Sequence, residues 1–132
     1  MPRRSTGTYP ADWPDIARAV KDGAGWRCVR CGHPHDPEAG RTLTVHHISL
    51  DKSDCRWFNL AALCQACHLS VQARVDLRRP WVMLEHSEWA RPYMAAHYAW
   101  RYLGQELTRD EAESRLDELL QLERQVVLGA AP

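Results

Sequence analysis

The spacing of apolar positions along the chain predicts a small fold that mixes helix and strand. Residues 12–23 carry apolar side chains at helical spacing behind Asp12, a good helix-capping residue, and Gly23 ends the pattern. Residues 41–48 alternate in character and are rich in β-branched side chains, which predicts a strand. A second helix is expected over residues 68–77. A strand region with helices before and after it is typical of the α+β class.

Beyond Pro80 the pattern changes to two longer helices. Apolar and aromatic side chains recur at helical spacing over residues 87–103, and again over residues 108–128. The second of these segments opens with Thr108 and Glu111, at the spacing of a capping box. We therefore expect three parts: a flexible basic arm (1–10), a core domain (11–80) and a C-terminal helical extension (81–132). The extension is expected to pack on the core or to form an interface, either in a homodimer or in a larger assembly.

Composition and charge favour a soluble protein of the cytoplasm that has no membrane partner. The 132 residues are 45% apolar, but no continuous apolar run is long enough for a transmembrane helix, and the N-terminus lacks a signal-peptide pattern. The net charge is zero, yet residues 1–81 hold 12 basic and 8 acidic side chains, while residues 82–132 hold 5 and 9. A basic half beside an acidic extension is compatible with a polyanionic substrate.

Four of the five cysteines form two Cys-x-x-Cys pairs, and Cys55 is left over. The paired residues are Cys28, Cys31, Cys64 and Cys67. In a reducing compartment such pairs are typical of metal sites, because four thiolates can surround one Zn²⁺ ion as a tetrahedron. We therefore predict a structural zinc site that ties two distant segments of the chain together. Buried free thiols or a single redox pair are the alternatives.

Histidine and asparagine residues lie between and beside the cysteine pairs. His46 and His47 are adjacent on the predicted strand, where neighbouring side chains point to opposite faces. One imidazole can therefore bind a metal ion while the other stays free as a general base, an arrangement that suits phosphodiester hydrolysis. Asn59 can orient the base or complete the metal shell. Taken singly, His46 can also be a structural histidine, Asn59 a capping residue and His68 a spare zinc ligand.

The order of these residues resembles that of the HNH endonuclease family in its zinc-bearing form, which is common in phage and bacterial genomes. The resemblance rests on Val-His-His-Ile at residues 45–48 and on Asn-Leu-Ala-Ala-Leu-Cys-Gln-Ala-Cys-His at residues 59–68. It implies a ββα-metal core, similar to a treble clef, in which the zinc held by the four paired cysteines is structural. It also implies three roles: His47 is the general base, Asn59 is the middle asparagine of the motif, and His46 and His68 bind one catalytic divalent cation.

The function that this resemblance implies is cleavage of DNA by a single-metal mechanism. Two imidazole ligands are compatible with Mg²⁺, Mn²⁺, Ni²⁺ or Zn²⁺ as the catalytic ion. Basic residues near the motif are candidates for contacts with DNA phosphates: Arg56, Arg74, Arg78 and Arg79. The loop after His47 lacks the proline and glycine that many relatives carry there. The alternative is a zinc-stabilised nucleic-acid-binding module, or a nuclease subunit that acts only with a partner in a phage packaging or defence assembly.

Overall fold

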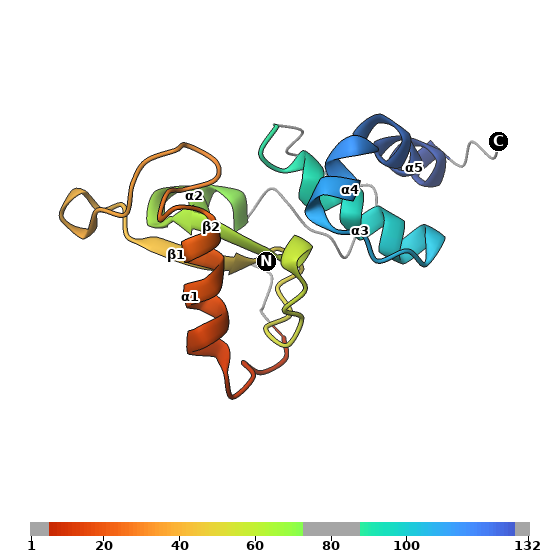
Figure 1. Ribbon diagram of the computed structural model, residues 1–132. Helices are drawn as coiled ribbons and strands as arrows, with labels where there is room; N and C mark the ends of the chain where they lie inside the picture. The colour runs from red at the N-terminus through yellow and green to blue at the C-terminus, as the bar shows by residue number, and fades with distance from the viewer. Residues whose placement is uncertain (1–5, 73–87, 129–132) are drawn as a thin grey trace.

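The computed structural model of this chain describes residues 6–72 and 88–128 (Figure 1). In chain order the elements are α1 (Trp13–Gly23), the 3-10 turn η1 (Pro37–Ala39), β1 (Leu43–His47), the 3-10 turn η2 (Trp57–Asn59), β2 (Leu60–Cys64), α2 (Gln65–Gln72), α3 (Arg91–Leu103), α4 (Arg109–Ser114) and α5 (Leu116–Leu128). Helices around a two-stranded sheet confirm the predicted α+β class. Within the described ranges, no helix combines the length and the apolar character needed to cross a membrane.

The two strands form an antiparallel hairpin that holds the chemistry-bearing residues. Its register runs from Leu43 opposite Cys64 to His47 opposite Leu60. Helices α1 and α2 both pack against this hairpin (Figure 1). Because successive side chains on a strand point to opposite faces, His46 is turned toward α2 and His47 toward α1. The hairpin and α2 together make a ββα unit.

The ββα unit differs from the sequence prediction at its edges. Strand β1 is shorter than the predicted range 41–48. Strand β2 was not predicted as a strand, because every residue in it is buried and the run shows no polar alternation. Helix α2 begins at Gln65, earlier than the predicted start at His68. Gln65 and Ala66 favour helix, and the Gln65 amide donates to the Thr42 carbonyl at 2.9 Å, which fixes the turn from strand into helix.

The described part of the C-terminal extension, residues 88–128, contains three helices rather than the two predicted. The expected helix over residues 108–128 begins with its predicted capping box but breaks at Arg115. The Ser114 hydroxyl donates to the Glu111 carbonyl at 2.8 Å. In a continuous helix that carbonyl would accept from the Arg115 amide. The Arg115 amide donates to the Ala112 carbonyl instead, at 3.2 Å, so the helix ends and restarts.

An apolar core joins the ββα unit to the extension. Phe58 in η2 is fully buried, and its neighbour Trp57 donates its indole N–H to the Leu107 carbonyl at 2.9 Å. The Trp57 ring centroid also lies 5.8 Å from that of Tyr93 in α3. The extension therefore packs on the core, and it does so through the segment that precedes β2.

Residues 6–10 lie against the loop that follows β1. The Thr6 amide donates to the Leu50 carbonyl at 2.8 Å, and the Thr6 carbonyl accepts from the Lys52 amide at 2.9 Å. The sequence predicts a flexible arm over residues 1–10, whereas these backbone hydrogen bonds hold its second half in place. Residues 1–5 lie outside the described range.

Candidate metal centre and histidine site

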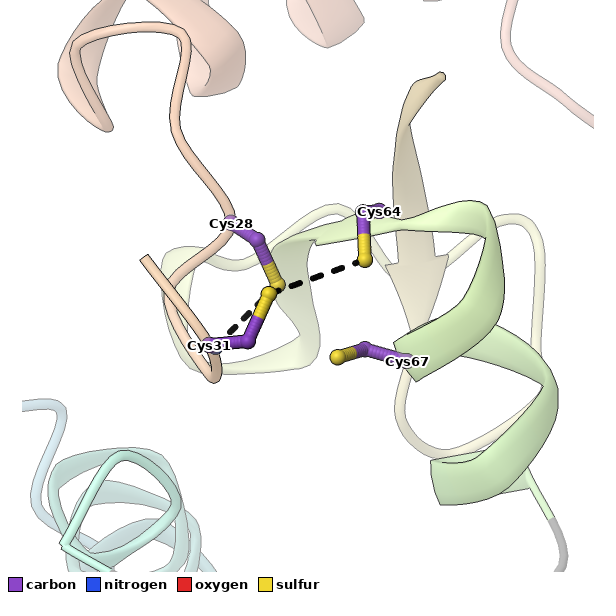
Figure 2. Close-up of side chains that lie close together, drawn as sticks. All are labelled: Cys28, Cys31, Cys64 and Cys67. Carbon is purple, nitrogen blue, oxygen red and sulfur yellow. Dashed lines mark hydrogen bonds between the residues drawn. The ribbon is translucent and has the colours of Figure 1, made fainter. Parts of the chain in front are cut away.

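Four cysteine side chains converge on one point beside the hairpin (Figure 2). Cys28 and Cys31 lie after α1, Cys64 ends β2, and Cys67 lies in the first turn of α2. All four Sγ atoms lie within 4.8 Å of one another, and those of Cys31 and Cys64 are 3.8 Å apart. A tetrahedral Zn²⁺ ion with Zn–S bonds of ~2.3 Å places its sulfurs about 3.8 Å apart. The cluster therefore fits a metal ion such as zinc, as the paired spacing predicts.

Two arginines donate hydrogen bonds to the cysteine cluster. Nη1 of Arg41 lies 3.4 Å from Sγ of Cys64, and Nη1 of Arg30 lies 3.5 Å from Sγ of Cys67. Burial raises the pKa of the Cys64 thiol, but hydrogen bonds from Arg41 and Cys67 outweigh burial and lower that pKa to about 6. Burial prevails at Cys67 and raises its pKa to about 12. The two guanidinium donors therefore favour the thiolate form that a metal ion binds.

His46 on β1 and His68 on α2 face each other. Nδ1 of His46 lies 3.0 Å from Nε2 of His68. Two nitrogens bound to one ion at ~2.1 Å lie roughly 3.0–3.4 Å apart, so the pair suits a shared metal ion. On its far side, Nδ1 of His68 lies 2.9 Å from the Thr44 hydroxyl, which donates to the Leu63 carbonyl at 2.7 Å. Among the described residues, no further cysteine, histidine or carboxylate completes a cluster of three here.

His47 lies on the opposite face of β1, against aromatic rings from the N-terminal part of the chain. Its ring centroid is 4.7 Å from that of Trp13 and 5.8 Å from that of Tyr9. Nε2 of His47 is buried and has no hydrogen-bond partner among the described residues. An imidazole nitrogen that no protein group occupies can accept a proton, as a general base must.

Burial keeps these imidazoles neutral near pH 7. Burial, together with the neighbouring His68 and His47, lowers the pKa of His46 to about 3. Burial also lowers the pKa of His47, although the Asp54 and Asp51 carboxylates oppose it, and burial lowers the pKa of His68. Each neutral ring keeps a lone pair, which metal binding and base catalysis both require.

Asn59 is fully buried and holds the loop that follows His47. Its Oδ1 accepts from the Ser49 amide at 2.7 Å, and its Nδ2 donates to the Asp54 carbonyl at 2.8 Å. The Asn59 carbonyl accepts from the Ile48 amide at 2.9 Å. Its side-chain groups are therefore committed to the loop. Of the two roles expected from the sequence, this geometry favours orienting the loop over completing the metal shell.

Arg56 is held between the same loop and α3. Its guanidinium donates to the Asp54 carboxylate at 2.6 and 2.9 Å, and its Cζ lies 3.7 Å from the centroid of the Trp100 ring. A contact between Arg56 and DNA phosphate remains a prediction. Three other arginines predicted to bind DNA lie outside the described residues: Arg74, Arg78 and Arg79. The expected domain boundary at residue 80 also lies outside them.

A cavity of about 250 Å³ opens at the histidines. Its lining is formed by Tyr9, Val45, His46, His47, Leu50, Lys52 and His68. Tyr9 is 54% exposed, and the Lys52 ammonium lies 5.3 Å from the centroid of its ring. A larger cavity, of about 650 Å³, lies between α1 and α3; its lining is mainly apolar and includes none of the histidines. The smaller cavity is therefore the one where the chemistry-bearing residues meet.

Sequence reasoning missed two contributors to this site. Thr44 shares a strand face with His46, and the alternation of side chains along the predicted strand could have identified it. Tyr9 reaches His47 only because residues 6–10 pair with the loop after β1, a tertiary contact that carries no sequence signal.

Comparison with known proteins agrees with this geometry. A family model described as HNH endonuclease matches residues 28–74. The match begins at the first cysteine of the cluster and spans both strands and the described part of α2, so it includes the three histidines and Asn59. No curated protein and no solved structure matches the chain significantly.

Proposed function

We propose, on the match of residues 28–74 to the HNH endonuclease family model, that this chain cleaves DNA by a single-metal mechanism. In this proposal His47 is the general base, His46 and His68 bind the catalytic divalent cation, and Asn59 positions the loop beside the base. The observation that carries the proposal is the 3.0 Å approach of His46 Nδ1 to His68 Nε2. The unpartnered nitrogen of His47 lies on the adjacent residue of the same strand.

The protein's own groups supply the proton transfer and the positioning. When bound, a divalent cation offsets the charge that develops on the scissile phosphate and on its leaving oxygen. His47 accepts a proton from the attacking water, because burial lowers its pKa and leaves the ring neutral near pH 7. The Leu50 amide donates to the His47 carbonyl at 2.9 Å, so the loop held by Asn59 also fixes the backbone of the base.

The cysteine cluster supports a structural role for zinc in this proposal. It joins the segment after α1 to the start of α2, and α2 carries His68. A metal ion at the cluster would therefore fix His68 relative to the hairpin that carries His46. Because four thiolates close the coordination shell of Zn²⁺, this site suits a structural ion and leaves catalysis to the histidines.

The rim of the histidine cavity supports a nucleic-acid substrate. Lys52 places its ammonium beside Tyr9 at the edge of the cavity, where a phosphate oxygen would gain a cationic contact. The exposed ring of Tyr9 offers a surface on which a base or sugar can stack. Both residues line the same cavity as His47, so contacts with them would hold the DNA backbone close to the imidazole of His47.

Cleavage of supercoiled plasmid tests this function. Zinc-loaded protein is incubated with Mg²⁺, Mn²⁺ or Ni²⁺, or with further Zn²⁺, and with EDTA as the metal-free control. We expect metal-dependent relaxed or linear DNA from wild type and from His33→Ala, a control outside the cavity lining, but not from His47→Ala. Full cleavage by folded His47→Ala would refute the mechanism. Binding without cleavage under every metal would favour a nucleic-acid-binding module.

A further inference from the structure

We infer that Thr44 is a positioning residue that fixes the tautomer of His68, so that the Nε2 lone pair of His68 is presented to the catalytic cation. The inference deepens the proposed function and rests on the metal site proposed there. It is drawn from a chain of three hydrogen bonds that runs from β2 through β1 to α2 and back to β1.

The direction of the first hydrogen bond determines the others. A threonine hydroxyl has one proton, and the Thr44 hydroxyl donates that proton to the Leu63 carbonyl at 2.7 Å. Its contact with His68 Nδ1 at 2.9 Å must therefore be one in which the threonine oxygen accepts. Nδ1 of His68 consequently carries the proton.

A neutral imidazole protonated on Nδ1 has its lone pair on Nε2. In His68, Nε2 is the nitrogen that faces His46 Nδ1 at 3.0 Å. Without an ion, that lone pair accepts a hydrogen bond from the Nδ1–H group of His46. When an ion binds, the same lone pair would face it, because the hydrogen bond between Thr44 and His68 Nδ1 fixes the orientation of the ring.

The location of Thr44 explains how the strand enforces this arrangement. Thr44 lies two residues before His46 and therefore on the same face of β1. It also pairs directly with Leu63 in the antiparallel register, which brings the acceptor carbonyl within reach of the hydroxyl. The hydroxyl is thus held by the sheet itself, which makes it a rigid support for a metal ligand. Outer-shell partners of this kind typically change metal affinity by about 10–100-fold when removed.

The matched variants are Thr44→Val, which keeps the β-branched shape but removes the hydroxyl, and Thr44→Ser, which restores it. Mn²⁺ binding to the full zinc-loaded chain is measured by calorimetry, since Mn²⁺ binds thiolates much more weakly than Zn²⁺ does and leaves the cysteine site to zinc. We expect Thr44→Val to weaken Mn²⁺ binding about 10–100-fold and Thr44→Ser to bind close to wild type. Equal affinity of wild type and Thr44→Val, with both proteins folded, would overturn the inference.

The tautomer of His68 can be measured in the zinc-loaded protein without adding a catalytic cation. A long-range ¹H–¹⁵N correlation spectrum of the zinc-loaded wild type should show His68 protonated on Nδ1, and Thr44→Val should lose that preference. A wild-type His68 protonated on Nε2 would refute the role of Thr44, even if the protein cleaves DNA. Conversely, the expected tautomer in a protein that never cleaves DNA would leave the role of Thr44 supported while the proposed function fails.

Discussion

The side-chain oxygen of Asn59 accepts a hydrogen bond from the Ser49 amide at 2.7 Å, and this contact anchors the loop two residues beyond His47. The same side chain donates to the Asp54 carbonyl, near the far end of that loop, at 2.8 Å. One buried amide therefore closes the loop at two points. Asn59 therefore acts on the backbone that follows His47, and these side-chain hydrogen bonds go to the loop rather than to His46 or His68.

Asn59→Ala is expected to destabilise the fold by roughly 2–4 kcal/mol, because it leaves the Ser49 amide and the Asp54 carbonyl without their buried partner. Urea unfolding monitored by circular dichroism measures the change. Ser53→Ala is the matched control, since it removes an exposed hydroxyl that donates to Asp51 in the same loop. Similar losses of stability in the two variants would show that the loop does not depend on Asn59.

Arg41→Gln is expected to weaken zinc binding about 10-fold. The variant removes the guanidinium that donates to Cys64 at 3.4 Å, and with it the charge that stabilises the thiolates. Competition with a chromophoric chelator measures the zinc affinity. Arg27→Gln is the control, because Arg27 donates to the Gly32 carbonyl beside the same cluster rather than to a cysteine sulfur. Equal chelator competition by Arg41→Gln and Arg27→Gln would contradict the role of Arg41.

Asp54 should make the loop sensitive to acid. Its carboxylate pairs with Arg56 at 2.6 Å, and their side chains are only 17% and 28% exposed. Burial raises the pKa of Asp54, but hydrogen bonds from Arg56 outweigh burial and lower it. Because the folded pKa lies below the unfolded value of ~3.9, the pair stabilises the fold above that pH and loses this effect as pH falls through the folded pKa.

Asp54→Asn is therefore expected to cost about 1 kcal/mol at pH 7, where the wild-type carboxylate is ionised. The difference between the two proteins should shrink at pH 3, below the unfolded value of ~3.9, because the unfolded chain binds a proton there that the folded carboxylate resists. Urea titrations of both proteins at the two pH values measure this. A difference that stays the same at pH 3 would mean that the ion pair does not contribute and that the substitution acts through packing.

The candidate metal ligands could be predicted from the sequence because each group has a recognisable local spacing. Each Cys-x-x-Cys pair reaches across a single turn, and Cys67 and His68 are adjacent, so the cluster and the ligand helix are specified together. The opposite directions of His46 and His47 follow from the strand period alone. These features depend on neighbouring residues, and the structure brings them together as expected.

The features that the sequence did not predict depend on tertiary contacts between residues far apart in the sequence, or on competing hydrogen bonds. Strand β2 has no polar alternation because both of its faces are covered. Tyr9 joins the site through the pairing of Thr6 with the loop after β1. The break before α5 coincides with a hydrogen bond from the Ser114 hydroxyl to the Glu111 carbonyl, which a continuous helix would pair with the Arg115 amide. Apolar spacing carries no information on any of these.

Ser114→Ala tests that account of the helix break. The substitution frees the Glu111 carbonyl to accept from the Arg115 amide and replaces serine with the best helix former. We expect higher helicity by circular dichroism and a gain in stability of about 0.5 kcal/mol. Glu113→Ala, on the adjacent exposed position, is the control: it also introduces alanine and releases no carbonyl, and the pair with Arg109 that it removes is exposed and contributes only a few tenths of a kcal/mol. Equal changes in both variants would show that the break has another cause.

Lys52→Gln tests whether the rim of the histidine cavity binds DNA. The ammonium of Lys52 lies beside Tyr9 at the cavity that His47 lines, so neutralising it should remove one phosphate contact. Each such contact contributes about 0.9 to the slope of log affinity against log salt for duplex DNA, so the slope should fall by roughly one. Fluorescence anisotropy with a labelled duplex measures it, in the His47→Ala background so that the DNA stays intact. Lys21→Gln is the control, because Lys21 lies over Trp26 at the other end of α1. If both variants keep the wild-type slope, Lys52 does not contact a DNA phosphate.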